Sequence, residues 1–245
     1  MLGYLDFMTQ WPIWGKILVG QVLFFTVPTG LAFAFLYKWS HHPFHKRKIQ
    51  PLSAIRSSLS HEVRYSIQSS VIFAINGSLI YLFASKGWTL IYSELSDYSL
   101  LYSCSSVIFL IIIHDAYFYL THRCMHHRLI FNAVHRIHHE CTTPSPWAAY
   151  AFSPIEAIIQ AAFLTMVVFI LPLHPIAIYV FMAHMLVRNI LGHSGYEIFP
   201  SGTVRHKLMS FITTNTHHDL HHSSKGYNYG LYFTYWDKLM DTEHP

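Results

Sequence analysis

Uncharged stretches long enough to cross a lipid bilayer dominate the first half of the chain. Ile17 to Tyr37 holds 21 residues without a charged side chain, close to the ~20 that a helix needs to span ~30 Å of hydrocarbon. Tyr65 to Ala84 and Tyr98 to Ile113 repeat the pattern. We predict three membrane-spanning helices, the first kinked at Pro28. A signal peptide is the competing interpretation of the first stretch, but no basic segment precedes it and its apolar run is too long.

Two further apolar segments, Ile155–Leu171 and Pro175–Val187, flank a short proline-rich connection. Because proline breaks helices, we expect a tight reversal and a helical hairpin that enters the membrane and returns. Arg128 to Glu140 predicts one short helix. The predicted fold class is therefore all-α: an integral membrane helical protein with three spans, a membrane-entering helical hairpin and a cytoplasmic histidine-rich helical cap. Residues 1–109 would carry the membrane spans and a basic loop, and residues 110–241 the histidine-rich region.

Composition supports a membrane protein. Only 11% of the residues are charged, against about 25% in soluble domains, and the mean hydropathy is +0.30. The net charge of +4 is small and no basic stripe is interleaved with stacking aromatics, which excludes nucleic acid as a partner.

The distribution of basic residues predicts the orientation. The segment from Lys38 to Arg64 holds six basic residues against Glu62 alone, so the positive-inside rule places it in the cytoplasm. Counting two further crossings places the histidine-rich region on the same side, in a bacterial inner membrane or the endoplasmic reticulum.

Fifteen of the 20 histidines lie between His114 and His222. Imidazole is a common ligand of transition metals, and helical residues three and four apart share a face. Nine histidines with this spacing, or close to it in the chain, are too many for one ion and suit two. The candidate ligands of this dinuclear site are His122, His126, His135, His138, His139, His193, His218, His221 and His222.

Other polar residues near these clusters have weaker claims. His127 and His217 are possible additional ligands, whereas His114, His174, His184 and His206 are expected to be ordinary hydrogen-bonded side chains. Cys104, Cys124 and Cys141 form no CxxC motif and are treated as bystanders. Carboxylates commonly accept the second N–H of a ligating histidine, which nominates Asp115, Asp219 and Glu156 for that orienting role, with ordinary interfacial carboxylates as the alternative.

The order of motifs HRxxHH, HxxHH, PSPWAAxAF, GHSGYE, HHDxHH and NYGLYFTxWD resembles the fatty acid hydroxylase superfamily of membrane di-iron enzymes, closest to its sterol desaturase branch. The resemblance covers about residues 110 to 241. The family's ligands match the nine histidines residue by residue. Two positions depart from the pattern of relatives: Ser153 and Asn189 stand where histidines are found, and Asn189 could still orient a ligand.

The resemblance implies two iron ions, O2 as co-substrate, and electrons from NAD(P)H delivered by a reductase and a small haem or iron–sulfur carrier protein. The reaction would hydroxylate or desaturate a lipid C–H bond in a membrane-embedded substrate. Trp147 and Phe152 are candidate residues of the substrate channel, with plain packing as the alternative. Sterol, fatty acyl, sphingoid, alkylglycerol and carotenoid substrates all stay open, as do a histidine-rich membrane metal transporter and an inactive scaffold.

Overall fold

The computed structural model describes residues 11–39, 41–49, 55–207, 209–224 and 226–244, with side chains from residue 59 in the helix that begins at Ile55. All regular secondary structure in these ranges is helical, which confirms the all-α prediction. The α-helices are α2 (Ile13–Phe33), α3 (Ile55–Ser85), α4 (Leu100–Met125), α5 (Phe131–Val134), α6 (Arg136–His139), α7 (Pro154–Val167), α8 (Pro175–Gly192), α9 (Asn215–Ser223) and α10 (Tyr235–Leu239). Shorter turns are the π-helix η1 (Ala34–Lys38) and the 3-10 helices η2 (His45–Arg47), η4 (Leu95–Asp97), η5 (Pro146–Tyr150) and η6 (Thr203–Arg205).

Four described helices are long and apolar enough to cross a membrane: Ile13–Lys38, Leu59–Ser85, Leu100–Met125 and Pro175–Gly192. The first three contain most of each predicted span, and the third runs on past Ile113 through the first histidine motif. The fourth is α8, the second arm of the predicted hairpin, whereas its first arm, α7, has only 14 residues. The chain is an integral membrane helical protein, as predicted.

Local capping fixes where several helices begin. Ser99 and Ser153 accept backbone N–H groups at the starts of α4 and α7, and His174 does so for α8 through Nδ1. Pro154 and Pro175 occupy the first turns of α7 and α8, where a missing N–H removes no helical hydrogen bond. Residues 168–174 thus connect the two arms of the hairpin.

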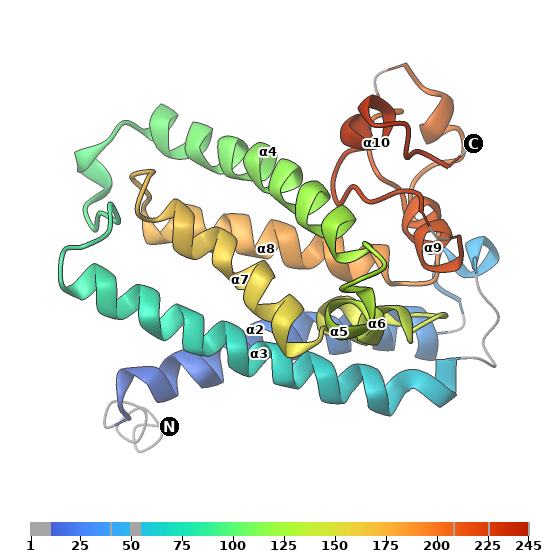
Figure 1. Cartoon of the computed structure of the whole chain (residues 1–245), viewed down its shortest axis with the longest axis horizontal. Coiled ribbons are helices and arrows are strands. Elements are labelled where there is room, and N and C mark those ends of the chain that lie inside the picture. Colours follow the sequence, from blue (N-terminus) through green and yellow to red (C-terminus); the bar gives the residue numbers. More distant parts are fainter. Residues whose placement is uncertain (1–10, 40, 50–54, 208, 225, 245) are drawn as a thin grey trace.

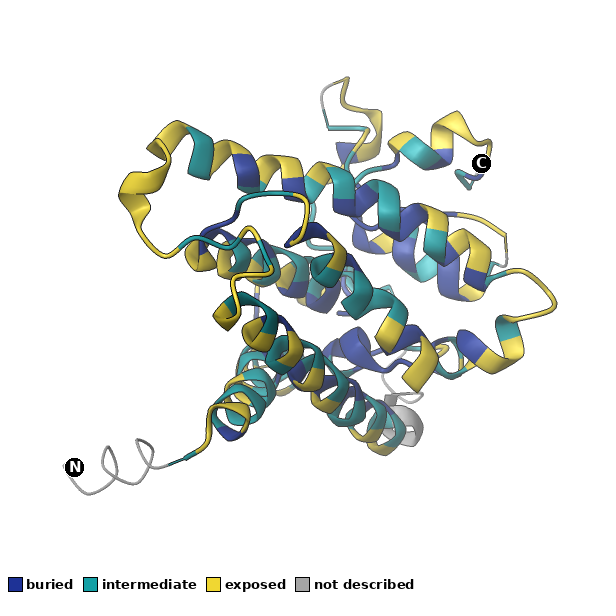
Figure 2. Ribbon diagram, turned by 60° about the vertical axis from the view of Figure 1, so that its left-hand side comes forward, coloured by how far each residue is buried: buried dark blue, intermediate teal, exposed yellow. Residues whose placement is uncertain are grey.

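The long helices form a bundle with the histidine-bearing segments at one end (Figure 1). α2 packs on α3, α3 on α7, and α4 on α8. α5, α6 and α9 gather where α4 and α8 end and α7 begins, whereas residues 86–99 and 168–174 connect the helices at the opposite end. Exposed residues follow the outward faces of the long helices (Figure 2) and include Leu31, Leu100 and Ile112, each more than half exposed. Such an apolar outer surface suits lipid rather than water.

The segment 128–140 differs from its prediction. Instead of one helix it forms α5 and α6, which meet at His135. The Ser153 hydroxyl donates to the carbonyl of Val134, the last residue of α5, and His135 Nδ1 lies 2.8 Å from Glu156 Oε1. These two buried contacts with the start of α7 hold the chain at the break. Local sequence periodicity could not predict the break, because the contacts join segments about 20 residues apart.

Candidate metal centre

The nine candidate histidines converge into two groups. Within each group, one ring nitrogen of every member lies within 4.8 Å of those of the other members. The first group is His122, His126, His135, His139 and His221, and the second is His138, His193, His218 and His222. The two groups adjoin: the His139 and His222 ring centroids are 4.8 Å apart.

The helical spacing decides which group each histidine joins. Pairs four residues apart stay together: His122 with His126 at the end of α4, His135 with His139 across α5 and α6, and His218 with His222 on α9. The members three residues along, His138 and His221, join the opposite group. Each three-histidine cluster thus contributes to both groups, because adjacent helical side chains such as His138 and His139 diverge by ~100°.

Backbone carbonyls hold three of the rings. His122 Nδ1 lies 2.9 Å from the Tyr229 carbonyl oxygen, His221 Nδ1 2.7 Å from that of Tyr227, and His193 Nδ1 2.8 Å from that of Asn189. A carbonyl only accepts hydrogen bonds, so each Nδ1 carries the proton and each Nε2 presents a lone pair. Their Nε2 atoms are the ones that face other histidines.

A carboxylate holds a fourth ring. His135 Nδ1 and Glu156 Oε1 are 2.8 Å apart, and the side chains of both residues are at most 2% exposed. Glu156, in the first turn of α7, therefore contacts a ligand ring, as an orienting residue would. Held at Nδ1 by this contact, His135 turns its Nε2 toward the first group.

The facing nitrogens suit a bound cation. His122 Nε2 lies 3.0 Å from His135 Nε2, and His193 Nε2 lies 2.9 Å from His218 Nε2. With Nδ1 protonated on both rings, the His122–His135 contact would set two lone pairs against each other, an arrangement that a shared metal ion relieves. Burial lowers the pKa of His193 and of His221 to about 4, so both rings are neutral at pH 7. The donor set fits two nitrogen-preferring transition-metal ions.

The other predicted orienting residues have different surroundings. Asp115 accepts the backbone N–H groups of Tyr232 and Phe233, so it holds the C-terminal segment rather than a ligand ring. Asn189 contributes its carbonyl to His193, while its side chain donates to Ala149. Asp219 is half-buried on α9, and its orienting role stays a prediction.

The additional histidines lie outside both groups. His127 is exposed, and His217 Nδ1 lies 2.9 Å from Thr214 Oγ1 in the cap of α9. Among the four expected to be ordinary, His114 Nδ1 lies 2.9 Å from the Tyr232 hydroxyl, and His174 caps α8.

A cavity of about 580 Å³ extends through the bundle from its opposite end to residues that contact the candidate ligands, although none of the nine candidate histidines lines it. It lies between α2, α3, α4, α7 and α8. Three of its lining residues contact the metal groups: Phe152 packs 5.4 Å from the His138 ring, Phe118 packs 5.0 Å from the His122 ring, and Asn189 bonds His193. Phe152 thus lies where a channel residue would, whereas Trp147 packs edge-on against Phe25 and does not line the cavity.

The C-terminal segment supplies a support that sequence reasoning missed. The Asp237 carboxylate accepts the backbone N–H groups of Tyr229 and Gly230, and Tyr229 in turn provides the carbonyl for His122. A Cβ on Gly230 would lie 2.3 Å from the Phe233 carbonyl oxygen, so only glycine fits. The available signal was the turn-rich sequence from Asn228 to Asp237, whose role depends on contacts with α4.

Comparison with known proteins gives consistent results. A sequence model described as fatty acid hydroxylase matches residues 107–242. Mouse lathosterol oxidase is 28% identical over 229 residues, covering 91% of this chain and 72% of that protein. A Delta(7)-sterol 5(6)-desaturase of Aspergillus fumigatus is 34% identical over 203 residues, covering 73% of this chain and 62% of that protein.

Methylsterol monooxygenase 1 of Danio rerio is 34% identical over 132 residues, covering 54% of this chain and 44% of that protein. The chain spans 61% of human lathosterol oxidase. No solved structure matches. These relatives are all named as oxidoreductases, and the family match covers more than half of the sequence, as the motif resemblance predicted. The chain belongs to the fatty acid hydroxylase family.

Proposed function

We propose that this chain is a membrane di-iron oxidase that hydroxylates or desaturates a C–H bond of a lipid, with a sterol as the substrate class. One observation carries the proposal: a lipid-sized apolar cavity reaches residues that contact two adjoining histidine groups. Pockets of ~300–1,000 Å³ accommodate small-molecule ligands, and 580 Å³ falls within this range. Residues 110–241 are proposed as the catalytic region, although α2 and α3 complete the cavity wall.

The five histidines of the first group would hold one iron ion and the four of the second group the other. Bound iron supplies the redox chemistry with O2 that no amino-acid side chain provides. The protein's own contribution is positional. The carbonyls of Tyr229, Tyr227 and Asn189 fix three rings, and Glu156 fixes the ring of His135.

The aromatic residues at the inner end of the cavity separate substrate from solvent. Phe118 and Phe152 are at most 9% exposed and contact both the cavity and a histidine ring. A lipid entering from the bilayer would meet them directly before the metal ions. Their apolar surfaces would exclude water from the reacting carbon.

The orientation proposed from charge places the histidine end of the bundle in the cytoplasm. Arg123, Arg128 and Arg136 are exposed at this end. A small haem or iron–sulfur carrier, reduced by NAD(P)H through a reductase, would deliver electrons there. A metal transporter is less well supported, because transport ligands belong at mid-membrane depth, whereas these groups lie at the end of the bundle.

The names of the relatives make lathosterol the first substrate to test. The chain, purified in lipid vesicles, is given lathosterol, O2, NADPH, a reductase and a carrier protein, and the sterols are analysed by mass spectrometry. We expect a product lighter by two hydrogens or heavier by one oxygen, absent without O2. Oxidation of an acyl, sphingoid, alkylglycerol or carotenoid lipid instead of the sterol would overturn the sterol assignment. If none of these lipids is oxidised, the assignment as an oxidase is overturned.

A further inference from the structure

The apolar cavity contains polar atoms that have no protein partner. Tyr150, Gln21 and Gln160 all line the cavity. The Tyr150 hydroxyl and the amide nitrogens of the two glutamines are buried without a hydrogen bond. Burying a hydroxyl or amide without a partner destabilises the folded protein, so most buried polar groups in native proteins are hydrogen-bonded.

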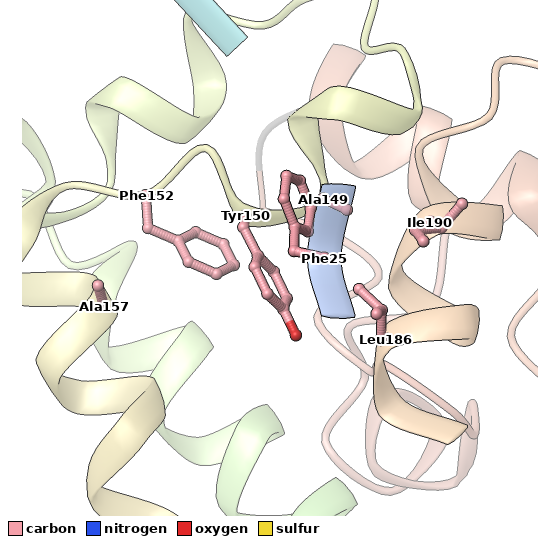
Figure 3. Packing of buried hydrophobic residues seen from close by; sticks show 7 residues of the cluster. All are labelled: Phe25, Ala149, Tyr150, Phe152, Ala157, Leu186 and Ile190. Atoms are coloured by element: carbon pink, nitrogen blue, oxygen red, sulfur yellow. The ribbon is translucent and has the colours of Figure 1, made fainter. Parts of the chain in front are cut away.

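Tyr150 is the most constrained of the three. It is 1% exposed, its ring stacks on Phe25 at 4.6 Å, and it meets Phe73 edge-on at 5.0 Å. Figure 3 shows its hydroxyl pointing away from the Phe152 ring, into space that none of the labelled side chains fills. The ring is therefore held in place, while its polar end is left for a ligand in the cavity.

Tyr150 also lies near the metal groups. Its ring is 6.2 Å from that of Phe152, which is 5.4 Å from the ring of His138. A lipid whose oxygen is bonded to Tyr150 could therefore extend along the cavity past Phe152 and place a carbon further along its length toward the histidines. Burial raises the pKa of Tyr150, so its hydroxyl stays protonated and can donate.

The charge of the cavity lining selects the kind of oxygen. Among the described lining residues, the one permanently charged side chain is that of Lys16, in the first turn of α2 at the opposite end of the bundle. No cation near Tyr150 lines the cavity to neutralise a carboxylate or phosphate. A neutral hydroxyl matches the tyrosine and the two amides, since it both donates and accepts.

We propose that Tyr150 binds the hydroxyl group of a lipid alcohol inside the cavity, with Gln21 and Gln160 as additional polar contacts, and thereby positions the carbon that is oxidised. The proposal deepens the proposed function and rests on it for the oxidation step. The binding step stands independently, because it requires only the cavity and the unpartnered hydroxyl. Tyr150 is accordingly a positioning residue.

A binding experiment separates hydrogen bonding from packing. Radiolabelled lathosterol and its analogue lacking the 3-hydroxyl are titrated into the purified chain, for wild type, Tyr150→Phe and the control Tyr235→Phe, which alters an exposed tyrosine of α10. We expect Tyr150→Phe to weaken lathosterol binding about three- to tenfold, the factor for one neutral hydrogen bond, and to leave the analogue unchanged. Equal losses for both probes, no loss for either, or no binding of lathosterol to wild type would overturn the proposal.

Turnover provides the second readout. Tyr150→Phe should raise KM for lathosterol and yield oxidation at more than one carbon, while Tyr235→Phe keeps a single product. An unchanged KM and a single product in Tyr150→Phe would overturn the positioning role while leaving the oxidase intact. Hydroxyl-selective binding by a chain that oxidises nothing would instead support the lipid-alcohol site and refute the proposed function.

Discussion

The histidine end of the bundle and the cavity behind it differ in how their polar groups are held. At the histidine end, rings from α4, the α5–α6 segment, the end of α8 and α9 converge, and carbonyls or Glu156 orient four of them. In the cavity the walls are mostly apolar and a few polar atoms have no partner. The first region has the fixed nitrogen ligands that metal ions would need. The second has space for a lipid whose polar group would supply the missing hydrogen-bond partner. Substitutions should therefore separate metal binding from substrate binding.

The largest effect is expected from removing one ligand. His126→Ala should lower turnover by at least a hundredfold and reduce the bound metal, because His126 Nε2 lies within 3.2 Å of the Nε2 atoms of His139 and His221. His138→Ala, His221→Ala and His222→Ala should do the same. Metal analysis and turnover are measured on variants that still insert into the membrane.

The neighbouring residue offers a matched control. His127 is exposed and outside both groups, so His127→Ala should keep most of the activity and both ions. Equal loss in His126→Ala and His127→Ala would contradict the assignment of ligands.

The next effect comes from the carboxylate behind the first group. Glu156→Gln replaces the carboxyl group beside His135 Nδ1 by an amide while keeping the size of the side chain. Loss of such a partner typically lowers metal affinity or activity about 10- to 100-fold. Metal titration of the variant measures the change, with Glu140→Gln at an exposed position as the control. Unchanged affinity in Glu156→Gln would show that the Glu156 carboxyl group does not support the site.

A change in the cavity should spare the metals. Ala161 on α7 lines the cavity, so Ala161→Phe fills space that the lipid needs. We expect turnover to fall about tenfold with both ions retained. Ile158→Phe on the same helix is the control, since Ile158 is 58% exposed on the outer face. Metal loss in Ala161→Phe would mean that the two regions are not separable.

A gradual change in the free energy of unfolding is expected as the pH is lowered. Burial lowers the pKa of His193 and His221 from 6.5 to about 4, so below pH 6.5 the unfolded chain binds protons that the folded chain does not. The free energy of unfolding of the metal-free chain should fall as the pH drops from 6.5 to 4, by up to on the order of 3 kcal/mol for each ring. Thermal unfolding across this range checks it, and a midpoint independent of pH would contradict the burial of neutral rings.

The helices and the histidine set could be predicted from the sequence because both depend on the pattern of neighbouring residues. Uncharged runs gave the spans, and i, i+4 spacing correctly paired His122 with His126. The assignment of His138 and His221 to the opposite groups could not be predicted, since it depends on how α6 and α9 face each other. The carbonyls of Tyr227 and Tyr229 were equally hidden, because every residue has a carbonyl and only tertiary contacts select these two. Tyr150 was missed because an absent partner is visible only in three dimensions.

The number of tightly bound iron ions per chain tests the central claim most directly. The chain is purified from iron-supplemented cells, and iron and protein are quantified together by mass spectrometry and amino-acid analysis. Two adjoining histidine groups predict close to two ions per chain, and fewer in His126→Ala and in His138→Ala. A wild-type chain that holds no tightly bound iron, or variants that retain both ions, would contradict the account.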